Sequence, residues 1–364
     1  AEVDLDAIRH NAGVLRGVAA PAALCAVVKA DGYGHGAVEV ARAAIDGGAT
    51  WLAVALVEEG AALRDGGLDA PILVLSEPPV DSFNEVVDRA LVPTLYTAKG
   101  VEAAAGAAGA DTLPVHVKVD TGMHRVGAPV DHALAVARAV VDAPSLDLQG
   151  FWTHLAVADE PDNSYTEQQL RRFDEVRAQL ADAGITPALV HAANSAGAIA
   201  HPRARYDLVR CGIALYGEAP SAEVGPDLGL RPALALKAGV SYVKPLAAGE
   251  RVSYGLRWQA QRDTVLATVP LGYADGVTRR LSAVGGEVLI GGRRCPIAGT
   301  VTMDQITVDC GPDATVTVGD EVVLIGRQGD EEITAAEWAG RLDTISYEVL
   351  CGIGPRVPRV HLHP

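Results

Sequence analysis

Residues 24–45 read LCAVVKADGYGHGAVEVARAAI, which is an apolar run, a glycine-rich turn and then an alanine-rich stretch with helical periodicity. A second apolar run, residues 51–56, follows after a short connection. A strand, a helix and a further strand in this order are typical of one βα unit of a parallel sheet. The stretch therefore predicts the unit from which the first part of the chain is built.

The same unit recurs over the first two thirds of the chain. Strand-like runs alternate there with alanine-rich helical stretches such as 36–45, 80–87, 98–108, 132–141 and 167–183. The eight predicted strands are 24–30, 51–56, 71–75, 91–96, 114–120, 148–155, 189–194 and 207–216. Eight units in about 220 residues favour a (β/α)8 barrel of the TIM type over an open doubly wound sheet, which is the alternative.

The pattern changes after about residue 230, where Arg231 and Pro232 interrupt it. Strand-like runs separated by Gly and Pro turns follow, at 234–243, 264–269, 286–290, 306–308 and 321–325. Two short helices are predicted near 335–341 and 346–351. We therefore expect an α/β barrel domain over residues 1–231 and a mostly-β domain over residues 232–364.

Composition excludes several classes of protein. The chain has 364 residues with 30 Lys and Arg against 46 Asp and Glu, and a net charge of −16 makes nucleic acid or an anionic membrane a poor partner. No apolar run reaches the roughly 18 residues of a membrane helix. The five cysteines are widely spaced without a CxxC pair, so neither a disulfide scaffold nor a zinc site is expected. The acidic N-terminus does not resemble a signal peptide, which favours a cytoplasmic location.

Lysine is rare in this chain, since only five of the 30 basic residues are lysines. One of them, Lys29, closes the first predicted strand. Burial lowers the pKa of an amine and makes it nucleophilic, so a lysine at the end of a buried strand is costly unless it has a function. Such an amine can bond covalently to an aldehyde. A lysine that merely extends to solvent explains the position equally well.

Polar side chains also follow the other predicted strands, at the end where barrel enzymes carry their chemistry. The Ser195 hydroxyl and the backbone N–H groups of Gly212 and Ile213 can hold a phosphate, because the loops after the last two strands form the usual phosphate site of this fold. A lysine at one rim and a phosphate site at the other are what pyridoxal 5′-phosphate requires. Three further histidines are interpreted as structural, and no metal site is predicted. These histidines are His10, His116 and His191.

With these residues in place, the chain resembles the alanine racemases, which are pyridoxal-phosphate enzymes with a barrel and a β domain. The resemblance runs from residues 2–11 to residues 356–359, essentially the whole chain. Its most specific motif is AVVKADGYGHG at 26–36, followed by GYADG at 272–276 and MDQ at 303–305. Three separate motifs in the same order make a chance match improbable.

The resemblance implies a role for each matching residue. Lys29 corresponds to the lysine that binds the cofactor covalently and then acts as one base, and Tyr273 corresponds to the second base. Arg210 corresponds to the arginine that faces the pyridine nitrogen. The other cofactor contacts correspond to Tyr33, His154, Asn194, Ser195, Gly212, Ile213 and Tyr347. The substrate contacts correspond to Arg125, Met303 and Asp304, and Lys118 corresponds to a lysine that is often carbamylated.

The resemblance also implies the substrate and the assembly. The expected reaction interconverts L-alanine and D-alanine, which supplies D-alanine for bacterial peptidoglycan. The expected assembly is a homodimer in which each active site joins the barrel of one chain to the β domain of the other. Thr302 stands where many relatives have Cys, and the chain ends Arg359-Val360-His361 where an aromatic residue is commoner. The first departure leaves the fine selectivity for the substrate open.

The side chains themselves favour racemisation over related reactions. Arginine stays charged and donates only, so Arg210 cannot accept a proton from the pyridine nitrogen, which disfavours transamination. A phenol has a pKa of about 10, so Tyr273 needs a nearby positive charge or donor to act as a base, and His154 is a candidate.

Three alternatives remain at this stage. The first is a serine or broad-specificity racemase, which the sequence does not exclude. The second is a barrel-type pyridoxal-phosphate decarboxylase, which would place an acidic residue where Arg210 stands. The third is a non-catalytic pyridoxal-phosphate carrier, which would have no use for a β domain bearing Tyr273.

Overall fold

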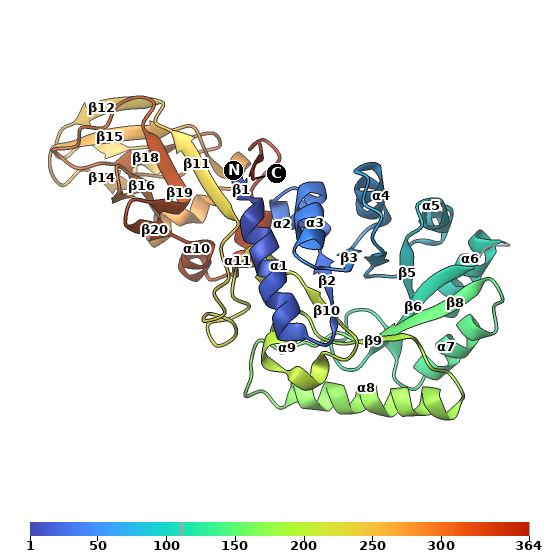
Figure 1. Ribbon diagram of the computed structural model, residues 1–364. Coiled ribbons are helices and arrows are strands. Elements are labelled where there is room, and N and C mark those ends of the chain that lie inside the picture. The colour runs from blue at the N-terminus through green and yellow to red at the C-terminus, as the bar shows by residue number, and fades with distance from the viewer. Residues whose placement is uncertain (110–111, 364) are drawn as a thin grey trace. The chain divides into compact units, whose positions relative to one another are not determined.

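The computed structural model describes residues 1–109 and 112–363, and these divide into two compact units (Figure 1). The barrel unit consists of Leu5–Gly32 and Gly36–Arg231. The β unit consists of Ala1–Asp4, Tyr33–His35 and the chain from Pro232 onward. Each unit is built from a different kind of sheet, parallel in the barrel unit and largely antiparallel in the β unit.

The barrel unit contains the eight predicted parallel strands. They lie in the order β10-β2-β3-β4-β5-β6-β8-β9, with a short strand β7 beside β6. Their bounds are β2 Ala23–Val27, β3 Trp51–Val54, β4 Ile72–Val74, β5 Val92–Leu95, β6 Leu113–Asp120, β7 Ala128–Pro129, β8 Leu146–Trp152, β9 Leu189–His191 and β10 Leu208–Cys211. The Asp207 N–H donates to the Val190 carbonyl at 2.9 Å and the Arg210 N–H to the Ala193 carbonyl at 3.0 Å. These bonds connect β9 with β10, which stand at the two ends of the strand order. The prediction of a TIM-type barrel is therefore confirmed.

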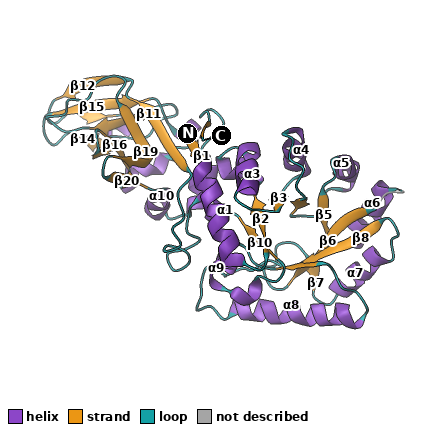
Figure 2. Cartoon of the chain, in the orientation of Figure 1, coloured by secondary structure: helices purple, strands orange, loops and turns teal. Residues whose placement is uncertain are grey.

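Amphipathic helices alternate with these strands (Figure 2). In α8 (Tyr165–Asp182) the residues Leu170, Phe173, Val176 and Leu180 are buried, at the three- to four-residue spacing of one helix face. The other helices are α1 Leu5–Ala19, α2 Lys29–Gly34, α3 Ala37–Asp46, α4 Val57–Asp65, α5 Phe83–Asp88, α6 Ala98–Ala108, α7 Ala133–Val141 and α9 Ser195–Ala200. Short 3-10 turns occur at η1 Val80–Ser82, η2 Pro202–Ala204 and η3 Ile213–Tyr216. None of the helices in the described part of the chain is long and apolar enough to cross a membrane.

The β unit holds three small sheets and two helices. A seven-stranded sheet has the order β17-β16-β19-β11-β1-β21 with β20 beside β19, a second sheet has the order β12-β15-β18, and β13 pairs with β14. The bounds are β1 Glu2–Asp4, β11 Leu234–Gly239, β12 Tyr242–Leu246, β13 Arg251–Val252, β14 Trp258–Gln259, β15 Thr264–Val269, β16 Glu287–Ile290, β17 Arg293–Pro296, β18 Ile306–Asp309, β19 Glu321–Gln328, β20 Glu331–Ile333, β21 Val360–Leu362, α10 Ala335–Leu342 and α11 Ser346–Cys351. The prediction of a mostly-β second part is confirmed.

One strand prediction in this unit is wrong. Residues 234–243 were expected to form a single strand, but β11 and β12 belong to different sheets. The Val240 N–H donates to the Asp320 carbonyl, whereas the next N–H, that of Ser241, donates to the Thr268 carbonyl. The chain therefore changes sheets between these two residues, which an uninterrupted apolar pattern does not reveal.

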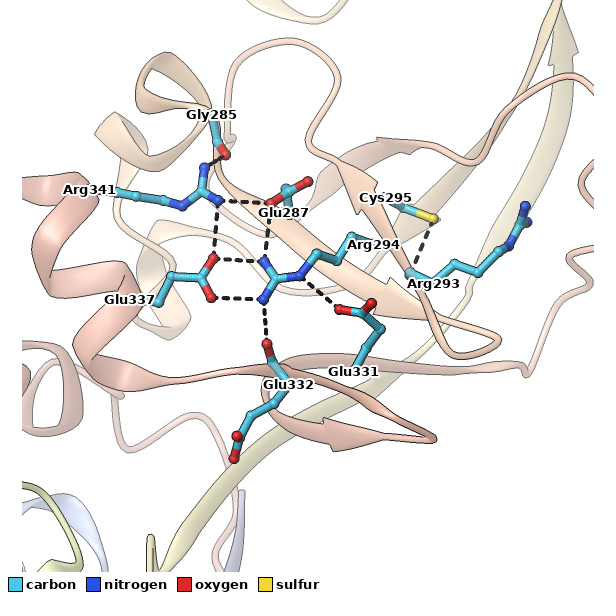
Figure 3. A network of polar contacts seen from close by, with 9 residues as sticks. All are labelled: Gly285, Glu287, Arg293, Arg294, Cys295, Glu331, Glu332, Glu337 and Arg341. Carbon is cyan, nitrogen blue, oxygen red and sulfur yellow. Dashed lines mark hydrogen bonds and ion pairs between the residues drawn. The ribbon is translucent and has the colours of Figure 1, made fainter. Parts of the chain in front are cut away.

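An ionic network fixes the outer hairpin of the β unit (Figure 3). The Arg294 guanidinium on β17 lies 2.8 Å from Glu337 on α10, 3.0 Å from Glu331 on β20 and 3.2 Å from Glu287 on β16. The hydrogen bond to Glu337 is the main reason why the pKa of Arg294 is raised. Arg341 on α10 pairs with the same Glu287 and Glu337 carboxylates. Shared partners of this kind stabilise more than isolated surface pairs do, so the network anchors β17.

Candidate active site

The segment that carries Lys29 has an unusual backbone. Strand β2 ends at Val27, and Lys29 is the first residue of α2 with a half-buried side chain, so the expectation that it closes a buried strand is wrong. The residues that follow have positive φ angles, 51° at Ala30, 51° at Asp31, 61° at Gly32 and 53° at Tyr33. A left-handed turn costs about 1–2 kcal/mol for each non-glycine residue. Such a turn persists only where its surroundings hold it.

Backbone N–H groups that donate to two carboxylates hold this turn. The Ala30 N–H donates to Glu59 Oε1 at 2.6 Å, and Glu59 also accepts from the backbone at the start of α4. Asp31 Oδ1 accepts from the Ala37 N–H at 2.9 Å, the first residue of α3. The residue that follows Lys29 is thus tied to α4 and the next one to α3, so the backbone beside the lysine is held from two sides.

Arg210 lies inside β10 and is 2% exposed. Its Nη1 is 2.7 Å from His191 Nδ1, and its Nη2 donates to the carbonyls of Thr153 and Ala192 at 2.9 Å. Nη2 also lies 3.2 Å from His154 Nδ1. Burial lowers the pKa of Arg210 to about 10, so the group is still a cation at neutral pH. Its Nε–H has no hydrogen-bond partner among residues 1–109 and 112–363, which leaves it as a donor for a ligand.

His191 is a site residue that the sequence interpretation missed. An arginine can only donate, so His191 Nδ1 accepts from Arg210, and its Nε2 proton points to His116 Nδ1 at 3.0 Å. The His191 ring also stacks on Trp152, with centroids 5.4 Å apart and an 11° angle between the planes. Lys118, Trp152 and His191 are cross-strand neighbours on β6, β8 and β9. Only this register singles out His191, and the register is not visible in the sequence.

Lys118 is 3% exposed and lies above the face of Trp152, with Nζ 4.4 Å from the ring centroid. Burial, followed by the positive charges of Arg210 and Arg125, lowers the pKa of Lys118 to about 7. A large share of this amine is therefore uncharged at neutral pH. Arg125 itself is exposed on the loop after β6, and no hydrogen bond or ion pair reaches its side chain from the described residues.

His154 follows β8 and is uncharged. Burial is the largest cause that holds its pKa well below the usual range, and Arg210 and Lys118 lower it further. Because Nδ1 faces an Arg210 donor, the proton of the neutral ring lies on Nε2. His154 was expected to assist Tyr273 either as a positive charge or as a hydrogen-bond donor. The neutral ring contradicts the first role and leaves the second available.

The predicted phosphate residues come together at the ends of β9 and β10. The Ser195 Oγ accepts from the Gly212 N–H at 2.9 Å and from the Ala214 N–H at 3.4 Å, and Ile213 lies between these two residues. Asn194 caps α9 by accepting from the Gly197 N–H at 2.9 Å. The Ser195 O–H still has its proton to donate, as a phosphate oxygen requires. No cluster that could hold a metal ion occurs in the described ranges.

The remaining predicted residues belong to the β unit. Tyr273 is 43% exposed on η5 (Tyr273–Asp275), and its N–H donates to the Thr302 carbonyl at 3.0 Å. The next N–H, that of Ala274, donates to the Met303 carbonyl at 3.1 Å. A Cβ on Gly272 would lie 2.3 Å from the Met303 carbonyl oxygen, which explains the glycine that precedes the tyrosine. Tyr273 and the 302–303 segment are therefore held together by their backbones.

Three other predicted site residues of the β unit fall into two groups, a pair of tyrosines and one aspartate. The Tyr33 and Tyr347 rings are neighbours, with centroids 6.2 Å apart. Asp304 is exposed and forms an ion pair of 2.8 Å with Arg356. The carboxylate of Asp304 is thus already neutralised by a side chain of its own unit.

The residues at the barrel mouth fit a pyridoxal 5′-phosphate group. Arg210 offers its Nε–H to an acceptor such as a pyridine nitrogen, and the Ser195 hydroxyl offers a donor to a phosphate. Lys29, the first residue of α2, provides the amine for a covalent link. What this arrangement can do chemically is hold a phosphorylated aldehyde whose ring faces a cation that cannot give up its proton.

Comparison with known proteins relates the whole chain to one group of enzymes. Residues 3–220 match the family model of the alanine racemase N-terminal domain, and residues 233–361 match that of the C-terminal domain. The chain is 50% identical to the alanine racemase of Symbiobacterium thermophilum, over 99% of this chain and 96% of the relative. It is 47% identical to the alanine racemase of Thermobifida fusca, over 99% of this chain and 97% of the relative.

Solved structures give the same relation. The alanine racemase of Bacillus anthracis with bound L-Ala-P is 40% identical, with a TM-score of 0.93 over 100% of this chain and 94% of that one. The alanine racemase of Streptomyces lavendulae is 40% identical, with a TM-score of 0.94 over 100% and 96%. A histidine racemase from Leuconostoc mesenteroides is 32% identical, with a TM-score of 0.91 over 99% and 97%. The same architecture therefore accompanies two different amino-acid substrates.

Proposed function

The chain belongs to the alanine racemase family, and from this premise we propose that it interconverts L-alanine and D-alanine with pyridoxal 5′-phosphate and the two bases Lys29 and Tyr273. The observation that carries the proposal is the buried Arg210, whose Nε–H remains available as a donor at the mouth of the barrel. The histidine racemase relative keeps a second candidate open, which is a racemase for another amino acid.

The direct experiment is racemisation from both sides. Pure L-alanine and pure D-alanine should each reach the same equal mixture of enantiomers, and serine and histidine should turn over more slowly. A protein that racemises histidine or serine but leaves alanine unchanged would assign it to the second candidate.

We propose that residues of the barrel unit hold the cofactor. When bound, pyridoxal phosphate supplies an aldehyde that takes up the substrate amine and a ring that accepts electrons from Cα. Lys29 is the residue for the covalent link, and Ser195 with Gly212 and Ile213 is the phosphate site. Asn194 supports this site by capping α9. The family resemblance adds Tyr33 and Tyr347 to the phosphate contacts, and their neighbouring rings support a joint role.

Arg210 would direct the chemistry toward racemisation. It stays a cation at neutral pH and its guanidinium has no acceptor, so a pyridine nitrogen that faces it stays unprotonated. An unprotonated ring accepts less electron density, and this disfavours proton delivery to the cofactor instead of to Cα. His191 accepts from Arg210 and fixes the plane of the guanidinium.

The two bases would act on opposite faces of Cα. The Lys29 amine would serve one face once the substrate has displaced it from the cofactor, and the Tyr273 phenol would receive or return a proton on the other. His154 is neutral with its proton on Nε2, so it can assist Tyr273 only as a hydrogen-bond donor. Because the Tyr273 N–H donates to the Thr302 carbonyl, the backbone of this base is tied to the 302–303 segment.

The substrate carboxylate would lie between Arg125 and the Met303 backbone. Arg125 is exposed and available for a charge-assisted hydrogen bond. The Asp304 carboxylate already pairs with Arg356, so its role is to place the Met303 segment and not to meet a like-charged substrate. Thr302 donates its hydroxyl proton to the Gln305 carbonyl at 2.7 Å, which closes the turn around Met303.

Replacement of Arg210 by glutamate tests whether Arg210 faces the pyridine ring of the cofactor. We expect racemisation to fall about 100-fold or more, because a positioned electrostatic donor is lost. We also expect a new long-wavelength absorption band with alanine, because a carboxylate can keep the pyridine nitrogen protonated. The measurement is the absorption spectrum of the enzyme with pyridoxal 5′-phosphate bound, and Arg210→Lys is the control that keeps the positive charge. An Arg210→Glu spectrum equal to that of the wild type would mean that Arg210 does not face the ring.

Lys118 is expected to carry a carbamate. Its pKa of about 7 leaves much of the amine unprotonated, which is the form that reacts with carbon dioxide. The amine is protonated below that pKa and neutral above it, so carbamate occupancy should rise as the pH increases through 7. A carbamate would replace the repulsion of Arg125 by a charge-assisted hydrogen bond, and Lys118→Ala should raise KM for alanine roughly tenfold.

The measurement is a carbamate signal in the ¹³C NMR spectrum after addition of labelled bicarbonate. The signal should be absent from Lys118→Arg and present in Lys99→Ala, since Lys99 is exposed on α6. A crystal structure with a bare Lys118 amine and an ordered Arg125 would contradict the expectation.

A further inference from the structure

Two buried cysteines of the β unit, Cys295 and Cys310, lie opposite one another on neighbouring strands. Cys295 belongs to β17, and Cys310 directly follows β18. The two strands are joined by an antiparallel bridge between Ile297 and Val308. The bridge is isolated, and counting two residues along the chain from each of its ends makes Cys295 and Cys310 the next pair on the same face.

The backbone of this hairpin sets the spacing of the pair. The Ala298 N–H donates to the Thr307 carbonyl at 2.8 Å, and the Thr307 hydroxyl donates to the Ala298 carbonyl. Hydrogen-bonded and non-hydrogen-bonded pairs alternate in an antiparallel ladder, so the bridge and the cysteine pair occupy non-hydrogen-bonded positions. Cα atoms at such positions are about 4.5 Å apart. A disulfide requires a Cα separation of about 4.4–6.8 Å, which a pair in this register would satisfy.

The side chains of the pair face the same interior. Cys295 is 3% exposed and Cys310 is 4% exposed, and their strand neighbours Ile297 and Val308 are buried on the same face. The two thiols interact with one another. Each thiol donates to a carbonyl of its own strand, Cys295 to Arg293 and Cys310 to Val308, and the interaction between the two thiols lowers the pKa of Cys295 and, together with burial, raises that of Cys310. One thiol is therefore easier to ionise than the other, which suits an attacking and a resolving cysteine.

The other cysteines have different surroundings. Burial raises the pKa of Cys25 and Cys211 in the barrel unit, that of Cys211 to about 12. Such thiols are unreactive packing residues. Cys351 is exposed at the end of α11. It provides an accessible thiol with which the buried pair can be compared.

We propose that Cys295 and Cys310 form a modification site, which a peroxide converts into an intrachain disulfide. The Cys295 thiolate attacks one oxygen of hydrogen peroxide, so the O–O bond breaks and a sulfenic acid and one water result. The Cys310 sulfur then attacks the sulfenic sulfur, the S–S bond forms and a second water leaves. In sum, two thiols lose two protons and two electrons, and one peroxide is reduced to two waters.

The position of the pair in the sheet gives a small oxidant a route. Strand β17 is the terminal strand of the seven-stranded sheet, so it pairs within that sheet on one side only. Figure 3 shows the Arg294 side chain bonded to its glutamates, while the Cys295 side chain leaves the same strand beside Arg293. The ionic network therefore ties β17 to β16, β20 and α10 on one face, and the disulfide would tie β17 to the end of β18 on the other.

The crosslink would close the hairpin whose loop carries Thr302 and Met303. The carbonyls of this loop accept the hydrogen bonds that hold Tyr273 and Ala274. We expect slower amide hydrogen exchange over residues 298–305 and a melting temperature raised by several degrees, because a closed loop restricts the unfolded chain. Any change in catalysis rests on the proposed function of Tyr273, whereas the crosslink itself does not depend on it.

The test is mass spectrometry of the loaded enzyme after treatment with hydrogen peroxide and then with N-ethylmaleimide. No Lys or Arg lies between Cys295 and Arg327, so trypsin releases both cysteines in the single peptide 295–327. We expect this peptide without a maleimide label and about 2 Da lighter than its reduced form. Cleavage before Asp304 then separates the cysteines, and the two fragments should stay joined until they are reduced.

Two variants control the assignment. Cys295→Ser should leave Cys310 open to the label once the protein is unfolded, and Cys351→Ser should form the crosslink like the wild type. Two labels on peptide 295–327, at a peroxide dose that oxidises Cys351, would overturn the proposal. Oxidation of either cysteine to a sulfinic acid without a crosslink would overturn it as well.

Discussion

Lys29→Ala is expected to abolish racemisation, with a fall in kcat of about 10⁴-fold or more, because the substitution removes one base and the covalent link to the cofactor together. The side chain is half-buried, and its backbone is tied to α4 through the bond between Ala30 and Glu59. The alanine variant keeps the backbone bonds that hold the left-handed turn, so the protein should fold. The loss is therefore chemical and not structural.

The measurement is steady-state racemisation together with peptide mapping after borohydride reduction. Reduction of the wild type should fix the cofactor on the peptide that contains Lys29, and reduced Lys29→Ala should hold no cofactor there. Lys99→Ala is the matched control and should keep full activity. The informative competitor is Lys118, because its pKa of about 7 also leaves a nucleophilic amine at the mouth of the barrel. A label on Lys118 in the wild type would show that the roles of the two lysines are exchanged.

The barrel could be predicted because its strands are continuous apolar runs. Each of the eight runs is short and bounded by helical stretches, and in the structure the residues of β3, β4 and β5 are all buried. This alternation of short apolar runs with helical stretches is visible in the sequence alone. The short strands of the β unit carry no such signal, since β13, β14 and β21 have only two or three residues each and depend on distant partners.

Residues of the candidate site could be predicted where their role depends on residue type. They could not be predicted where their role depends on the register between neighbouring strands. Ser195 and Gly212 lie in loops next to strand ends, and the structure brings them within one hydrogen bond. His191 could not be recognised, because its role comes from the strand register that aligns it with Trp152. The charge of His154 was equally hidden, since it depends first on the burial of its own ring and then on the positive charge of Arg210 beside it.

The left-handed turn after Lys29 could not be predicted either. The glycines of the motif indicate freedom of the backbone, but Ala30, Asp31 and Tyr33 adopt positive φ angles as well. Local preference opposes this conformation, and only the surrounding hydrogen bonds select it. The motif is therefore specific for a shape that its own residues disfavour, which is typical of a functional site.

Mixed dimers of two inactive variants are expected to regain activity. We propose that each site joins the barrel unit of one chain to the β unit of the other in a closed two-fold dimer. Lys29→Ala damages only the barrel contribution, and Tyr273→Phe removes only the hydroxyl of the β contribution. In a mixed dimer one site then has both defects and the other has neither. About half of the sites in purified mixed dimers should be fully competent, and about a quarter in an unfractionated equal mixture.

Co-expression with two different affinity tags and tandem purification yields the mixed dimers. Their specific activity should approach half that of the wild type, whereas the parent variants should each stay inactive. Two differently tagged copies of Lys29→Ala provide the control for the purification. If each site were built within one chain, every site of a mixed dimer would keep one defect and no mixture could recover. Verified mixed dimers as inactive as their parents would therefore exclude the shared site, and Tyr273 would have to be assigned to the chain that carries its Lys29.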